Sequence, residues 1–414
     1  MIRTLLVLLP LVALPVVPQV SRHKDTDRVE LQSGKELKGR VVHQDDEVVL
    51  LRQGKRKPRE IPRDEVKSVS SLEQSLAEFI ERYDAVDKQD AEALGDLARF
   101  AESRGLTGEA AVTWVAAIFA DPSYRPAYEA LDARESKTKG WQFKIGKRWK
   151  TLEDAKAIEG SWKERWEIET THFVLRTDLP VERLPSIVVN IERFFLDYYA
   201  LMRRALKLWV FDEVPKINLY VEDGKMPRPP VPTDAWYDRI RNELDVRVRR
   251  EPDLSLIMSE MSRLMLFSSL RGTIGQTGTT PPWVGRGLAD LFGVAVVQQP
   301  DKAVSFDFTR EAQQLFQTHA AAAEPLSMDR ILTMSPPEFI DGTNHELARA
   351  QAYTLVHFMV FADEGKYLPG FGDYLQAAFG GQGSKTHLLK ALDLRKSDAL
   401  EEEWASYVRA KAGR

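Results

Sequence analysis

The spacing of hydrophobic and polar residues divides the chain into regions with different periods. Between residues 27 and 69, short apolar runs alternate with polar positions and are separated by turn signals at Ser33-Gly34 and Gln53-Gly54. Short strands with turns at such regular intervals are typical of a small β-barrel or an SH3-like module. The pattern therefore predicts a β-barrel module over residues 27–70.

Residues 71–135 change to a helical period, with apolar residues three and four positions apart on both sides of Gly105. These positions are Leu94, Leu97, Ala98, Ala101, Ala110, Trp114, Ala117 and Ile118. The stretch resembles a tetratricopeptide unit. Because one and a half such units cannot bury a solenoid core alone, we expect a helical hairpin that packs on its neighbours.

Residues 136–161 read as a linker and a hairpin. The segment ARESKTKG is polar and ends in glycine, and WQFKIGKRWKTLEDA follows it. The second segment predicts two strands around Gly146 and then a short helix capped by Thr151.

From residue 162 to the C terminus the pattern is α+β. WEIETTHFVLRTDL predicts one or two strands, residues 182–208 a long amphipathic helix, and KINLYVED another strand. Beyond Asp253 almost every segment has a helical period. The predicted fold class is α+β: a small β-barrel, a helical hairpin, then a domain over residues 162–414 with a short sheet and a mostly helical C-terminal half.

The first 22 residues have the outline of an export signal. A basic Arg3 precedes an apolar run of 16 residues from Leu5 to Val20, which three prolines interrupt. This run is shorter than the roughly 20 residues that span a bilayer as a helix. We interpret residues 1–22 as a signal peptide or N-terminal anchor of an exported protein (periplasmic, cell-envelope or secreted), and expect membrane association through this segment only.

Composition excludes several classes of function. With 58 basic and 62 acidic residues the net charge is −4, so no global field favours nucleic acid, and we expect no nucleic-acid partner. The basic run RQGKRKPRE is interpreted as a solvated hairpin tip. Because the chain has no cysteine, disulfides and thiolate metal sites are excluded.

Two segments carry the pattern on which the functional interpretation depends: LSLIMSEMSRLMLFSSLRG at residues 254–272 and WVGRGLADLFG at residues 283–293. With the preceding order of strand, long helix and strand, residues 162–414 resemble the peptidase MA-like, or gluzincin, domain of bacterial exported proteins. In that family the first motif supplies two histidine zinc ligands and a glutamate base. The second motif supplies a glutamate as the third ligand.

The ligand positions of that family are substituted here. Ser259 and Arg263 stand at the histidine positions and Arg286 at the ligand glutamate, while Glu260 matches the base and Asp290 the acid that orients a ligand. Arginine is a permanent cation that repels a metal ion. A carboxylate without zinc cannot make water a useful nucleophile. The resemblance therefore implies a degenerate site without metal or cofactor, in which Glu260 and Asp290 pair with Arg263 and Arg286.

Other candidate motifs are weaker. The segment NHELAR at residues 344–349 lacks a second histidine, and His357 lies on an apolar helix as a core histidine would. The glycines of RGTIGQTGTT at residues 271–280 follow a helix rather than a strand, which favours a loop at the rim of a cleft over a phosphate site. The proline-rich residues 224–236 are expected to form a loop that borders this cleft.

Three functions remain open from the sequence. The favoured one is an exported, non-catalytic pseudopeptidase that serves as a binding or scaffold module for an unknown protein or peptide. An alternative is an active metal-dependent or unconventional hydrolase that uses Glu260. A third is a purely structural envelope protein in which the fold is a relic.

Overall fold

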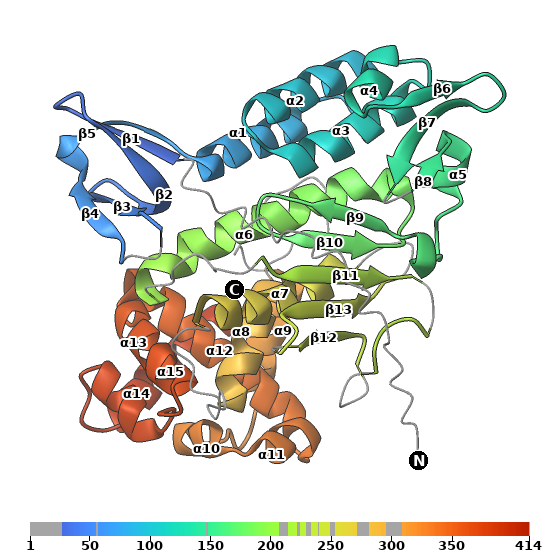
Figure 1. The fold of residues 1–414 in the computed structure, drawn as a ribbon. Helices are drawn as coiled ribbons and strands as arrows, with labels where there is room; N and C mark the ends of the chain where they lie inside the picture. Colours follow the sequence, from blue (N-terminus) through green and yellow to red (C-terminus); the bar gives the residue numbers. More distant parts are fainter. Residues whose placement is uncertain are drawn as a thin grey trace, which may run out of the picture.

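The computed structural model describes residues 27–54, 57–145, 148–206, 214–221, 224–228, 233–238, 240–248, 253–270, 281–294 and 309–413. The predicted α+β class is confirmed (Figure 1). The N-terminal segment 1–22 and the glycine-containing loop 271–280 lie outside these residues.

The N-terminal module is an antiparallel sheet with the order β4-β3-β2-β1-β5. Its strands are β1 (Asp27–Leu31), β2 (Glu36–Gln44), β3 (Val48–Arg52), β4 (Arg59–Pro62) and β5 (Val66–Ser70). Alternate residues of these strands form a small apolar core of their own, which consists of Val29, Leu31, Leu37, Val41, Val49, Leu51, Ile61 and Val66. The alternation in the sequence thus corresponds to the two faces of a sheet.

The helices that follow are α1 (Leu72–Ala85), α2 (Ala91–Ser103), α3 (Thr107–Ala120) and α4 (Arg125–Ala130). Ser71 caps α1 in a capping box with Gln74. The buried carboxylate of Asp27 accepts hydrogen bonds from the backbone N–H of Leu72 at 2.9 Å and of Val41 at 2.8 Å. The junction between the sheet module and α1 is therefore held by a buried side chain.

The segment expected to be a linker contains a strand. Residues Arg134–Ser136 form β6, which pairs with β7 (Gly140–Ile145); β7 also pairs with β8 (Arg148–Lys150). An aromatic contact holds this segment on the preceding helix: Trp141 of β7 stacks on Tyr128 of α4, with ring centroids 5.1 Å apart. The predicted cap is confirmed, since Thr151 forms a capping box at the start of α5 (Leu152–Lys156).

The central sheet has the order β12-β13-β11-β10-β9, in which β10, β11 and β13 are parallel and the two edge strands antiparallel. Its strands are β9 (Trp166–Glu169), β10 (Val174–Thr177), β11 (Lys216–Tyr220), β12 (Ala235–Asp238) and β13 (Glu243–Arg247). The expectation of a loop over residues 224–236 is wrong at its end, where Ala235 begins β12, and β13 was not predicted. Both strands are short, and tertiary pairing rather than local pattern defines them.

The long helix α6 (Leu184–Leu206) connects β10 to β11. Figure 1 shows it between the helices α1–α4 on one side and the C-terminal helices on the other. The C-terminal half is helical, as expected. Its helices are α7 (Leu254–Leu270), α8 (Pro282–Val294), α9 (Arg310–Ala320), α10 (Met328–Thr333), α11 (Pro336–Asp341), α12 (His345–Phe361), α13 (Leu368–Phe379), α14 (Lys385–Ala391) and α15 (Asp398–Ala412).

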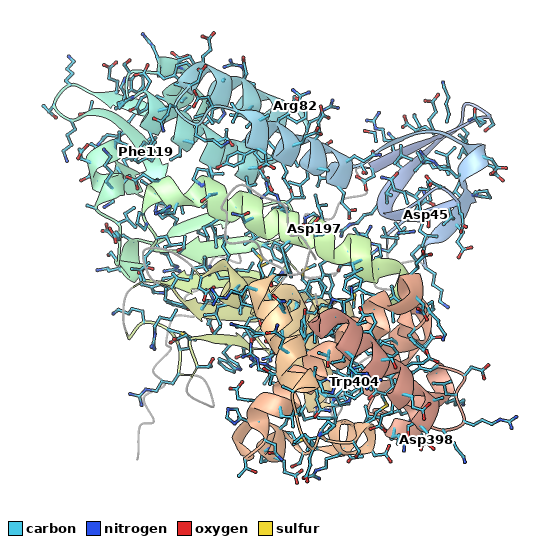
Figure 2. The ribbon with its side chains drawn as sticks, turned by 180° about the vertical axis from the view of Figure 1, so that it is seen from behind. Asp45, Arg82, Phe119, Asp197, Asp398 and Trp404 are labelled. Atoms are coloured by element: carbon cyan, nitrogen blue, oxygen red, sulfur yellow. The ribbon has the colours of Figure 1, made fainter. Side chains whose placement is uncertain are left out.

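One large core joins the central sheet, α6 and the C-terminal helices. Trp404 of α15 is buried in the helical part of this core. Asp45 belongs to the N-terminal module, on the other side of α6 (Figure 2). No helix in the described ranges combines the length and apolarity needed to cross a membrane.

Candidate functional site

The five candidate residues lie on two adjacent helices. Helix α7 carries Ser259, Glu260 and Arg263, and α8, which packs against it, carries Arg286 and Asp290. Glu260 and Asp290 are buried, with exposed fractions of 9% and 4%. The two motifs, separated in the sequence, thus meet in one place.

Small residues hold α8 close to its neighbours. The Oγ of Ser255 on α7 donates a hydrogen bond to the carbonyl of Gly293 at 2.7 Å. A Cβ added to Gly287 would lie 2.5 Å from the carbonyl oxygen of Ala352 and from a methyl carbon of Val356, both on α12. Only glycine therefore permits this approach of α8 to α12.

Each buried carboxylate forms an ion pair within its own helix. Nη1 of Arg263 lies 2.9 Å from Oε1 of Glu260, three residues away, and Nε of Arg286 donates to Oδ2 of Asp290 at 2.8 Å, four residues away. The pairing of these carboxylates with these arginines agrees with the prediction. The pairs follow helical spacing and do not connect α7 to α8.

A third arginine, which sequence reasoning missed, connects two helices. Arg349 of α12 donates through Nε to Oδ2 of Asp290 at 3.0 Å and through Nη2 to Oδ1 at 3.1 Å. Such a two-pronged pair is the strongest geometry available to a guanidinium and a carboxylate. The available signal is an arginine on a helix whose residues are almost all buried from Ala348 onward.

Charge acts across the interface of α7 and α8. Burial raises the pKa of Glu260 above its ordinary value, while the charges of Arg263 and then of Arg286 oppose this rise. The negative charge of Asp290 adds a smaller increase to the pKa of Glu260. The guanidinium of Arg286 is thus near enough to interact with carboxylates on both helices.

The residue types at this site limit its chemistry. Guanidinium groups are donors only and cannot ligate a cation. Among the described residues, no group of three or more histidine, aspartate or glutamate side chains could hold a metal ion. Within the same ranges, the backbone carbonyl of Ser259 accepts a hydrogen bond from the hydroxyl of Ser262 at 2.7 Å, and the hydroxyl of Ser259 has no bond to a base that would activate it as a nucleophile.

The predicted role of His357 as a core residue is confirmed. It is buried, and its Nδ1 lies 2.8 Å from the hydroxyl of Tyr407. Burial lowers the pKa of His357 to about 3, so the ring is neutral at physiological pH. His319 is also buried and pairs with Thr354 at 2.9 Å.

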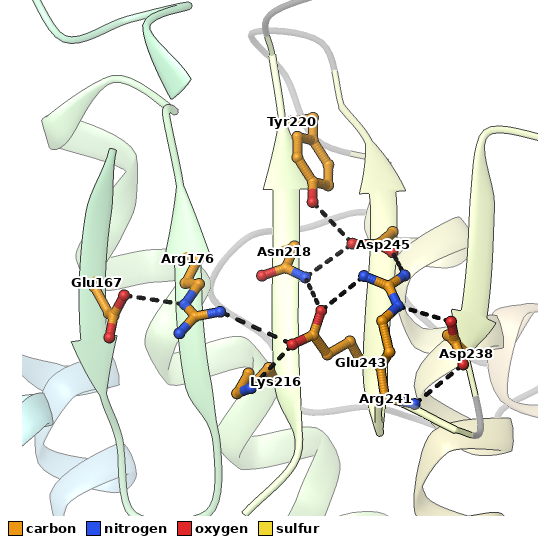
Figure 3. Close-up of polar contacts among 9 residues, drawn as sticks. All are labelled: Glu167, Arg176, Lys216, Asn218, Tyr220, Asp238, Arg241, Glu243 and Asp245. Atoms are coloured by element: carbon orange, nitrogen blue, oxygen red, sulfur yellow. Dashed lines mark hydrogen bonds and ion pairs between the residues drawn. The ribbon is translucent and has the colours of Figure 1, made fainter. Parts of the chain in front are cut away.

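A second polar cluster covers one face of the central sheet (Figure 3). Asp245 of β13 is fully buried and accepts hydrogen bonds from Asn218 at 2.8 Å and Tyr220 at 2.9 Å on β11. Arg241 donates to Asp245 and also to Asp238 on β12. These contacts fix the β12–β13 hairpin and give it a structural role.

The edge strand β12, which packs on α7, is partly capped by its own chain. The backbone N–H of Arg247 donates to the carbonyl of Asp234, so in this register the backbone groups of Ala235 face away from β13. The Thr233 hydroxyl donates to the Ala235 carbonyl at 2.9 Å and accepts from its N–H at 3.3 Å. Such capping reduces the tendency of an edge to pair with another strand.

No protein-family model and no curated protein matches the chain.

Proposed function

We propose that this chain is an exported, non-catalytic gluzincin-like protein, a pseudopeptidase, that binds a protein or peptide partner through the region of α7, α8 and α12. The observation that carries the proposal is the set of ion pairs at the former ligand positions. Arg263 and Arg286 stand where the resemblance places zinc ligands, and each is paired with a carboxylate that the resemblance retains. The guanidinium groups supply the positive charge that a metal ion would otherwise supply.

The arrangement of the secondary structure supports the same proposal. Strand β10, helix α6, strand β11, helix α7 and helix α8 follow one another in the order that the resemblance implies. Helix α7 packs against β12 and β13 at one end of the sheet. This order and this packing support the proposal, because the resemblance implies both.

An active hydrolase that uses Glu260 is less well supported. Its Oε1 is paired with Arg263 at 2.9 Å, so this oxygen already interacts with a permanent cation, which competes with a water molecule for it. Neither Arg263 nor Arg286 can bind a metal that would lower the pKa of water. The remaining alternative, a purely structural protein, differs from the proposal in having no ligand.

Metal analysis and a peptide-cleavage assay test the proposal. Purified protein should contain no stoichiometric zinc and should not cleave a peptide library. Chelators should leave its melting temperature unchanged. Stoichiometric zinc bound at α7 and α8, or cleavage that Glu260→Gln abolishes, would overturn it.

Rebuilding the ligand set gives a sharper test. The substitutions Ser259→His, Arg263→His and Arg286→Glu restore the ligand types, but Arg349 still occupies both oxygens of Asp290. We therefore expect zinc binding, measured by calorimetry, to improve when Arg349→Leu is added to the triple variant. Arg330→Leu, which removes an exposed arginine of α10, is the matched control.

A further inference from the structure

The cluster at α7, α8 and α12 contains more cations than its buried carboxylates require. Three arginines, Arg263, Arg286 and Arg349, surround Glu260 and Asp290, so this ion-paired set has a formal charge of +1. Glu346 also interacts with Arg349, but its side chain is 68% exposed and solvent screens it. One guanidinium is therefore surplus to the neutralisation of the buried pair.

Within the described part of the chain, much of the donor capacity of these arginines is unused. A guanidinium has five N–H donors. Arg286 contributes Nε to Asp290, and its side chain is 40% exposed. Arg263 contributes Nη1 to Glu260 and is 34% exposed, while its buried Nε has no hydrogen-bond partner in the described structure. Both groups can thus accept a further anionic partner without losing an existing pair.

The acceptor capacity of the cluster is largely used. Both oxygens of Asp290 receive hydrogen bonds from arginine, and Oε1 of Glu260 is paired with Arg263. An incoming cation would meet three guanidinium groups, whereas an incoming anion would meet unused donors. The sign of the charge therefore selects an anionic ligand.

We propose that Arg286 and Arg263 form a binding site for a carboxylate of a peptide or protein partner, an inference that rests on the proposed function of this region. The two oxygens of a carboxylate match the fork of N–H groups on a guanidinium, which makes arginine the usual residue for this recognition. The carboxylate belongs to an acidic side chain or to the C terminus of the partner. Its negative charge would neutralise the formal charge of +1 that the three arginines and two carboxylates leave.

Calorimetry or NMR with three short peptides tests the inference. The peptides are N-acetyl tetra-alanine with a free carboxylate, the same peptide as its amide, and an amidated version with one internal glutamate. We expect the first, the third or both to bind at least roughly tenfold more tightly than the neutral amide, as one charge-assisted hydrogen bond allows. The stronger of the two identifies the source of the carboxylate.

Substitutions assign the binding to this site. Arg286→Gln should weaken the preferred acidic peptide roughly tenfold, and Arg263→Gln should weaken it similarly, because both remove a charged donor. Arg286→Lys retains the charge without the fork and should fall between the wild type and glutamine. Arg330→Gln removes an ion-paired arginine of similar exposure on α10 and should have no effect. Melting temperatures of all variants separate loss of binding from loss of folding.

Three results would overturn the carboxylate site: equal affinity for acid and amide, binding of inorganic phosphate with no binding of either acidic peptide, or full binding by Arg286→Gln. If peptides bind regardless of charge, the binding function survives and only the carboxylate site is wrong. If the unmodified protein holds zinc here and cleaves the peptides, the proposed function itself is wrong.

Discussion

The molecule buries carboxylates in two regions and stabilises them in different ways. At α7 and α8, Glu260 and Asp290 are paired with arginines that remain partly exposed. Between α3 and α6, Glu109 and Glu192 are fully buried, and their hydrogen-bond partners are neutral. In the first region permanent cations contact the carboxylates, whereas in the second region the carboxylates have only neutral partners among the described residues.

The neutral partners of the second region come from the turn between β9 and β10. Glu192 accepts hydrogen bonds from the hydroxyl of Thr170, from the backbone N–H of His172 at 2.9 Å and from Nδ1 of His172, 2.6 Å away. Glu109 accepts from the backbone N–H of Thr171 at 2.8 Å, while its other oxygen has no partner in the described part of the chain. Burial lowers the pKa of His172 well below its ordinary value, so its ring is neutral.

The pKa values follow from this difference. Burial, reinforced by the charge of Glu192, raises the pKa of Glu109 to about 7, and burial also raises the pKa of Glu192 to about 7. Arg203, also on α6, is paired with Glu73 of α1 at 2.8 Å. Glu109 and Glu192, whose hydrogen-bond partners are neutral, therefore have pKa values near neutral pH.

Removing an acceptor from the second region should have the largest effect on stability. Glu192→Ala removes the acceptor of two buried groups of His172, its backbone N–H and Nδ1, whereas the Thr170 hydroxyl still has the carbonyl of Phe173 as an acceptor. We expect a loss of about 3–5 kcal/mol in the free energy of unfolding. Urea denaturation followed by circular dichroism measures it. The matched control is Glu129→Ala, which removes an exposed, ion-paired glutamate of α4 and should change stability by less than about 0.5 kcal/mol. A loss below about 1 kcal/mol for Glu192→Ala would contradict the assigned hydrogen bonds.

The pH dependence of the second region gives the next largest effect. The pKa of Glu109 is about 7 in the folded state and close to 4.5 in the unfolded chain, so the folded state binds the proton more tightly. Stability from this group is therefore fully present below pH 4.5 and is lost as pH rises through 7. Glu109→Gln does not titrate at this position. The free energy of unfolding of the variant minus that of the wild type should therefore increase from pH 5 to pH 8, by up to about 3 kcal/mol.

Denaturation of both proteins at pH 5 and pH 8 measures this gain. Coupling of Glu109 to Glu192 spreads the titration over a wider pH range without changing its sign. Comparing each variant with the wild type at the same pH cancels the contribution of His172. A difference that does not vary with pH would show that Glu109 keeps one protonation state from pH 5 to pH 8.

Breaking an ion pair in the first region should have the smallest effect. Arg349→Met removes the two-pronged contact but leaves Asp290 paired with Arg286, so we expect a loss of about 1–2 kcal/mol. Adding Asp290→Asn should cost less than the sum of the two single changes, because the two side chains interact directly. Strict additivity in this double-mutant cycle would show that the pair contributes no coupling energy. Arg330→Met is the control for general loss of an arginine.

Local signals in the sequence were sufficient for much of the fold. Alternating residues over 27–69 became strands, and the helical period after Ser71 became helices with the expected start. Thr151 caps its helix because a capping box needs only residues three positions apart. The pairs of Glu260 with Arg263 and of Asp290 with Arg286 are equally local, since helical spacing brings each pair together.

Contacts between distant segments were decided by the tertiary structure alone. Arg349 reaches Asp290 across 59 positions, and Glu109 reaches the backbone of Thr171 across 62. The identity of an acidic residue in the sequence does not show whether an arginine or a neutral amide will contact its carboxylate in the fold. Period and capping reflect interactions within one element, whereas the burial, partner and pKa of a charged side chain depend on which elements pack around it. The sequence by itself therefore determined where the helices, most strands and the local ion pairs form, and tertiary packing decided which buried carboxylates contact a guanidinium and which have neutral partners.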